Sequence, residues 1–182
     1  MAYCDLLRMT TLLAAGAATA LAAVSVITAD QDADTRTLVV CAAWWPLALA
    51  FGIVLGRPAR AAEAIAPALA AARTTPSLPT DQPGRVALAR LWPLVAFACI
   101  AGGLGFLWPG VPAVGTGFAL AAALAMRGRE GAVAAIEQRD GVRFYVEPGS
   151  SFEPVRLSRT PGLRRDRPPP AKPPPPPPAE AA

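Results

Sequence analysis

Four long apolar segments without a single charged residue dominate the first two thirds of the chain. A helix that crosses the roughly 30 Å hydrocarbon core of a bilayer needs about 20 apolar residues, and an ionised side chain inside that core costs about 3 kcal/mol or more. The segments therefore predict an all-α integral membrane protein with four transmembrane helices, arranged as two antiparallel hairpins. The predicted spans cover residues 11–28, 38–56, 91–108 and 111–126.

The third and fourth spans are separated by the sequence Trp108-Pro109-Gly110-Val111-Pro112. As one helix, residues 91–126 would measure about 54 Å, which is far longer than a bilayer requires. The prolines remove backbone donors and disfavour a helix in the residues that precede them. We therefore expect a tight turn at residues 109–110 between two separate helices.

Arginines concentrate on one side of the four predicted spans. Residues 57–90 hold five arginines against two acidic residues, and ten Lys or Arg residues follow residue 126. The opposite connection, residues 29–37, holds three aspartates and a single arginine. Because cytoplasmic loops carry the excess of Lys and Arg, we expect both termini, including residues 1–10, and the 57–90 connection in the cytoplasm. Residues 29–37 then form an acidic outer loop.

The composition indicates the source membrane. One lysine stands among 17 basic residues, and alanine and proline are abundant, which is typical of a GC-rich bacterial genome. We therefore expect a multi-pass protein of a bacterial plasma membrane, with the lipid bilayer as its first partner. The net charge of +4 follows from arginines that flank the spans, so no nucleic-acid partner is expected.

Residues 11–28 have a second interpretation, because Arg8, an apolar run and small residues near Ala29 are also typical of a secretory signal peptide. The apolar part of such a signal usually has about 7–15 residues. The run here is longer, which favours a retained span. Cleavage would leave three spans and an exported N-terminus.

Small side chains recur at intervals of four residues in the third and fourth spans. Small residues at this spacing let two helix backbones approach closely in lipid. Trp44 and Trp45 lie inside the second span and are expected to face a neighbouring helix, with Pro46 bending their own. The predicted helix-packing residues are Ala113, Gly117, Ala121, Ala125, Gly102 and Gly105.

The 57–90 connection is rich in alanine, proline and arginine. Residues 59–73 have the composition of a helix, but Pro67 is expected to break it. We therefore expect a solvated connector. After residue 126, residues 131–139 favour a continuing helix, which the sequence Asp140-Gly141 would end. A hairpin turn at Asp140-Gly141 is the alternative.

Residues 142–147 carry apolar side chains at alternate positions, which is typical of a β-strand, and residues 152–158 return with Phe152, Val155 and Leu157. They predict a small β-hairpin within the cytoplasmic segment 127–167. A two-stranded hairpin is marginally stable in water, so it must dock on the preceding helix, the 57–90 connection, another copy or a partner. We expect residues 141–167 to bind a cytoplasmic protein or anionic lipid through Phe144, Tyr145, Val146, Phe152 and Arg156.

The C-terminal tail, residues 168–182, is dominated by proline. Such a sequence cannot form a packed core and favours an extended polyproline II conformation. We predict a disordered tail.

Motifs for catalysis, metals and nucleotides are missing from the sequence. Gly105 and Gly110 match the first half of a phosphate-binding loop, but Val111 and Pro112 stand where that loop needs a lysine and a hydroxyl residue. The chain has no histidine and its three cysteines are far apart, so it has no Ser-His-Asp triad and no Cys or His zinc pattern. We expect no cofactor, no metal and no enzymatic activity.

Two functions remain after these exclusions. The first is a non-enzymatic structural or interaction protein whose cytoplasmic C-terminal segment binds a partner or anionic lipid. The alternative is a small transporter or channel subunit that uses the glycine-rich hairpin of the third and fourth spans. The spans contain no ionisable side chain for coupling an ion, which favours the first. Assembly into a homo-oligomer is compatible with both.

Overall fold

Within the residues that the structure describes, four helices are long and apolar enough to cross a membrane. They are α1 (Tyr3–Gln31), α2 (Thr35–Leu55), α4 (Pro83–Leu104) and α5 (Gly110–Asp140). This confirms the predicted number of membrane-spanning helices. The structure is a computed structural model that describes residues 1–31, 35–74, 83–108, 110–149, 151 and 153–161.

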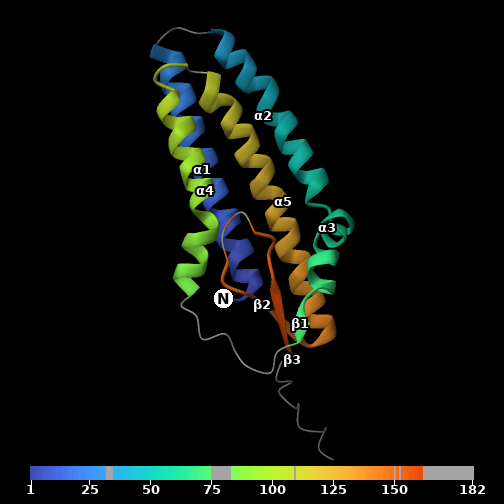
Figure 1. The fold of residues 1–182 in the computed structure, drawn as a ribbon. Helices are drawn as coiled ribbons and strands as arrows, with labels where there is room; N and C mark the ends of the chain where they lie inside the picture. The colour runs from blue at the N-terminus through green and yellow to red at the C-terminus, as the bar shows by residue number, and fades with distance from the viewer. Residues whose placement is uncertain (32–34, 75–82, 109, 150, 152, 162–182) are drawn as a thin grey trace, which may run out of the picture.

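The four long helices run side by side as a bundle, with a short helix and a small sheet at one end, here called the sheet end (Figure 1). The short helix is α3 (Pro58–Ala70). Successive long helices run in opposite directions, yet α5 packs most extensively on α1 and next on α2, and also contacts α3 and α4. The largest helix contacts therefore join helices that are not neighbours in the sequence.

Small residues allow α2 and α5 to pack closely. A Cβ atom added to Gly52 would lie 2.8 Å from the Cα of Ala121, and one added to Gly56 would lie 2.7 Å from the carbonyl oxygen of Leu124. A Cβ added to Gly128 would overlap the backbone of Gly56. Close packing of backbones across small residues is how helices associate in lipid.

Several helix ends differ from the sequence prediction. The helix α4 ends at Leu104 rather than residue 108, and the next residues form a turn in which the N–H of Trp108 donates to the carbonyl of Leu104 at 2.8 Å. The same helix begins eight residues before the predicted span, at Pro83. Pro109 lies outside the described residues, so the two-residue turn at 109–110 is not tested.

The 57–90 connection is more structured than predicted. Instead of a broken helix, α3 continues through Pro67, which lies in the last helical turn, where it removes a single hydrogen bond. A proline also stands at the start of α3, the position where a missing N–H costs least. The helix packs on α5 through the buried side chains of Ala61 and Ile65.

The sheet has three strands in the order β1-β3-β2. They are β1 (Arg73–Thr74), β2 (Val142–Val146) and β3 (Leu157–Pro161). Strands β2 and β3 are antiparallel, with Val146 opposite Leu157, and β1 is parallel to β3. The predicted second strand, residues 152–158, was placed too early. Because β3 is the central strand, its residues need donors and acceptors on both sides, and Pro154 has no N–H to offer.

The N-terminus extends the sheet beyond β2. Ala2 forms an antiparallel bridge with Tyr145, and the N–H of Val146 donates to the carbonyl of Met1 at 2.9 Å. The helix α5 ends just before β2 at Gly141, whose φ of +63° is favourable for glycine. The chain therefore passes from α5 into the sheet within one residue.

Candidate functional site

The sheet packs on the helices of its own chain. Phe144 is 4 % exposed and Val146 is 1 % exposed, and both belong to the hydrophobic core of the sheet end. The docking surface that the hairpin requires is thus made by α1, α3, α4 and α5. The helix residues of this core are Tyr3, Leu6, Leu7, Ile65, Val86, Leu91 and Val133.

The structure does not bring the five predicted binding residues onto one surface. Phe144 and Val146 point into the core, whereas Tyr145 between them is half-buried on the opposite face of β2. Arg156 is exposed just before β3. Phe152 lies outside the described residues. Alternation along the strand explains the separation, because neighbouring side chains of a strand point to opposite faces.

The face of the sheet directed away from the core carries basic and hydroxyl side chains. The strand register aligns Arg73 of β1, Ser158 of β3 and Tyr145 of β2 in one row. Arg143 and Thr160 are paired two residues further along. Arg73 and Arg143 are exposed, whereas Ser158 and Thr160 of the central strand are buried. We call these five residues the outer sheet face. Sequence reasoning missed Arg73, because nothing in the 57–90 connection indicates that it pairs with a distant strand.

The connection between β2 and β3 is attached to the beginning of α4. The hydroxyl of Ser151 donates to the carbonyl of Ala89, and Nη1 of Arg90 donates to the carbonyl of Glu153 at 3.3 Å. The N–H of Glu147 donates to the carbonyl of Arg156 at 3.0 Å. These bonds place Arg156 beside the outer sheet face and fix both to the bundle.

Glu137 covers the part of the β2 edge that the N-terminal residues leave unpaired. Its Oε1 accepts a hydrogen bond from the N–H of Phe144 at 3.0 Å, and its Oε2 accepts one from Sγ of Cys4 at 3.5 Å. An uncovered strand edge is a site for unwanted pairing. A carboxylate near the C-terminus of a helix is unfavourable for the helix dipole. The position of Glu137 near the end of α5 was therefore a sign, readable in the sequence, that its carboxylate contacts a particular group of the chain.

Cys4 lies in the first turn of α1, before the apolar segment 11–28. Burial, and secondly the carboxylate of Glu137, raises the pKa of its thiol to about 12. A thiol with such a pKa is a poor nucleophile near neutral pH, since the thiolate is the reactive form. Cys4 is therefore a structural contact in the sheet end.

Two tryptophans connect α2 to α5 inside the bundle. Nε1 of Trp44 donates to the carbonyl of Val114 at 3.0 Å, and Nε1 of Trp45 donates to the carbonyl of Ala113 at 2.9 Å. Trp44 also meets Phe118 edge to face, with 5.4 Å between ring centroids. Both tryptophans thus face a neighbouring helix, as their position in the second span predicted.

The predicted helix-packing residues of α5 lie mostly in contact with α2. A Cβ added to Gly117 would overlap the indole of Trp44, and Ala121 meets Gly52. Ala113 and Ala125 are buried. Sequence reasoning missed Gly52 and Gly56 of α2, although their spacing of four residues was readable.

The two glycines predicted to pack in the third span behave differently from each other. A Cβ added to Gly102 would make an ordinary contact of 3.7 Å with Leu21 of α1. Gly105 lies in the turn after α4, where an added Cβ would be 3.0 Å from Val24 and 2.9 Å from Pro112. Gly105 is therefore a close-contact position between the turn, α1 and α5.

Among the described residues, no group of three Cys, Asp or Glu side chains lies close enough to hold a metal ion. Comparison of the chain with protein-family models, with curated proteins and with solved structures finds no match.

Proposed function

We propose that the chain is a non-enzymatic protein of a bacterial plasma membrane that anchors a cytoplasmic protein partner through the outer sheet face. The observation that carries this proposal is the row formed by Arg73, Ser158 and Tyr145, with Arg143 beside it. The sheet that holds this row packs against α1, α3, α4 and α5. A half-buried tyrosine beside arginines is typical of binding surfaces, where tyrosine and arginine are enriched. The chemistry fits an acidic segment of the partner.

The orientation proposed for the bundle follows from its arginines. Arg57 ends the apolar segment of α2 and Arg127 ends that of α5, both towards the sheet end. Arg85 and Arg90 precede the predicted third span on the same side. The positive-inside rule then supports a cytoplasmic sheet end, and with it a cytoplasmic partner.

The rigidity of the sheet end supports recognition by a preformed surface. Phe144, Val146 and Leu157 fill one core with residues of four helices, and Glu137 covers the β2 edge. A surface held this way loses little conformational freedom on binding, which favours affinity. Tyr145 and Arg143 are therefore the residues expected to contribute most.

A crosslinking pull-down from native membranes with the full chain tests the proposal. We expect the double charge reversal Arg73→Glu and Arg143→Glu to remove the captured partner, because both charges lie on the outer sheet face with Tyr145. The matched control is the pair Arg60→Glu and Arg85→Glu, which makes the same change in net charge at exposed positions outside the outer sheet face. Equal capture by the sheet variant and the control would refute the assignment.

The transporter alternative receives no specific support from the bundle. The hydroxyls within the spans bond to their own helices, as Ser25 does to the carbonyl of Leu21 at 2.7 Å and Thr116 to that of Pro112 at 2.8 Å. The space beside Gly105 is occupied by the side chains of Val24 and Pro112. A liposome flux assay in which the wild-type chain conducts an ion or solute would restore this alternative.

A further inference from the structure

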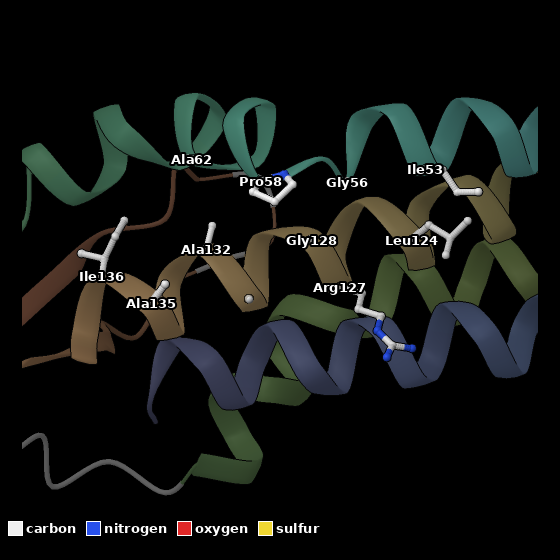
Figure 2. Close-up of a pocket in the computed structure, with 11 residues that line it drawn as sticks. Ile53, Gly56, Pro58, Ala62, Leu124, Arg127, Gly128, Ala132, Ala135 and Ile136 are labelled. Atoms are coloured by element: carbon white, nitrogen blue, oxygen red, sulfur yellow. The ribbon is translucent and has the colours of Figure 1, made fainter. Parts of the chain in front are cut away.

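An apolar groove lies where α2 passes into α3, on the side facing α5 (Figure 2). Its volume is about 690 Å³, which falls within the range of about 300–1,000 Å³ of small-molecule sites. Glycine and alanine make up most of its wall, with Ile53 and Leu124 at one end and Ile136 at the other. The remaining lining residues are Gly56, Pro58, Ala62, Arg127, Gly128, Gly131, Ala132 and Ala135.

The groove crosses the level at which the apolar segments end. Gly56 is the last residue of the apolar segment of α2 and is followed by Arg57, and Met126 ends that of α5 and is followed by Arg127. Gly56 and Gly128 are in close contact, since a Cβ on Gly128 would overlap the Gly56 backbone. The two arginines therefore flank one helix crossing at one depth, where lipid phosphates meet the hydrocarbon core.

The charges around the groove are unbalanced. Arg57 and Arg127 are both exposed, and Figure 2 shows the Arg127 side chain leaving α5 on the side away from α2 and α3, across α1, so that the floor of the groove stays apolar. In the described part of the chain, neither Arg57, which lies between the lining residues Gly56 and Pro58, nor Arg127 forms an ion pair with a carboxylate.

We propose that this groove binds an anionic phospholipid, independently of the outer sheet face. One acyl chain lies against Ile53 and Leu124, and the phosphate and its headgroup meet the guanidinium groups of Arg57 and Arg127. Arginine suits phosphate oxygens because it offers paired N–H donors. The apolar floor excludes a free phosphate as the occupant, because the groove has no polar side chain to bind it apart from the arginines.

Native mass spectrometry of the purified full chain tests the proposal with two lipids that have identical palmitoyl and oleoyl chains, phosphatidylglycerol and phosphatidylcholine. The wild-type chain should bind phosphatidylglycerol about tenfold more tightly. Arg57→Gln and Arg127→Gln should each weaken phosphatidylglycerol binding about fivefold, and leave phosphatidylcholine binding unchanged. Arg85→Gln is the matched control, an exposed arginine of α4 away from the groove.

Filling the groove gives a second test that does not alter charge. A Cβ on Gly131 meets nothing within 4 Å, so Gly131→Leu should fit without disturbing the backbone. Because Gly131 lies one turn beyond Arg127, the added side chain should obstruct the headgroup and weaken binding of both lipids. Gly16→Leu is the control, because that position in α1 is equally open. Circular dichroism of each variant establishes that it is folded.

Three results would overturn the proposal. They are equal binding of the two lipids by the wild-type chain, equal losses in Arg85→Gln and Arg57→Gln, and unchanged lipid binding in folded Gly131→Leu. The first comparison needs no variant, so a variant that fails to fold does not remove the test.

Discussion

Replacement of Gly117 by alanine is a direct perturbation of the contact between α2 and α5. An added Cβ would overlap the indole ring of Trp44, whose three nearest atoms all lie within 2.7 Å of its position. The indole must then move away from α5. That movement breaks the hydrogen bond from Trp44 to Val114 and the edge-to-face contact with Phe118.

The expected loss follows from these contacts. A hydrogen bond contributes about 0.5–1.5 kcal/mol and an aromatic pair a similar amount, while alanine is favoured over glycine in a helix by about 1 kcal/mol. Adding about 1–3 kcal/mol for overpacking, we expect Gly117→Ala to lower the free energy of unfolding by about 1–5 kcal/mol.

The assay is unfolding of the purified chain in mixed micelles by increasing SDS, followed by circular dichroism. The control is Gly103→Ala in α4, where an added Cβ meets nothing within 4 Å, and it should be neutral or slightly stabilising. In a Trp44→Ala background, Gly117→Ala should no longer destabilise the chain. If the loss is the same with and without Trp44, or if Gly117→Ala matches Gly103→Ala, the steric argument is refuted.

Three further predictions concern the sheet end and α1. Phe144→Ala should lower the free energy of unfolding by about 3–5 kcal/mol because it empties a core position. Tyr145→Ala, at a half-buried position, should lower it much less. Chemical unfolding of the two variants measures both free energies. Glu137→Gln should lower the raised pKa of the Cys4 thiol and speed its labelling by a water-soluble maleimide at pH 8, while an unchanged rate would contradict the contact. The chain purified from membranes should retain α1, because this helix is the most extensive partner of α5; an N-terminal sequence that begins after residue 29 would show cleavage instead.

The four spans could be predicted from the sequence because the bilayer acts on each segment separately. A run of apolar residues without charge is favourable in hydrocarbon whatever its neighbours are, so residues 38–56 correspond closely to α2. The ends of the helices were less predictable. Polar and charged residues continue α1 back to Tyr3 and extend α5 to Asp140, because these turns pack on the sheet rather than on lipid.

The candidate site was less predictable than the spans, because it depends on contacts between distant segments. The alternation of Val142, Phe144 and Val146 predicted a strand with one apolar face, but not that helices of the same chain would cover that face. Pairing of Arg73 with Ser158 joins residues with no local signal for each other. The aromatic residues that marked a binding surface in the sequence instead divide between core and surface, and only Tyr145 stays available of those that the structure describes.

The position of α5 at the centre of the bundle has a consequence for biosynthesis. This helix contacts every other helix, yet it is the last of them to leave the ribosome. At about 5–20 residues per second, the 109 residues from the end of α1 at residue 31 to the end of α5 at residue 140 require about 5–20 seconds. During that interval α1 and α2 reside in the membrane without their main neighbour, and the small-residue face of α2 is open to other membrane helices. Insertion factors that shield such faces should therefore be found crosslinked to nascent chains that stop before residue 110, and be released once α5 has entered.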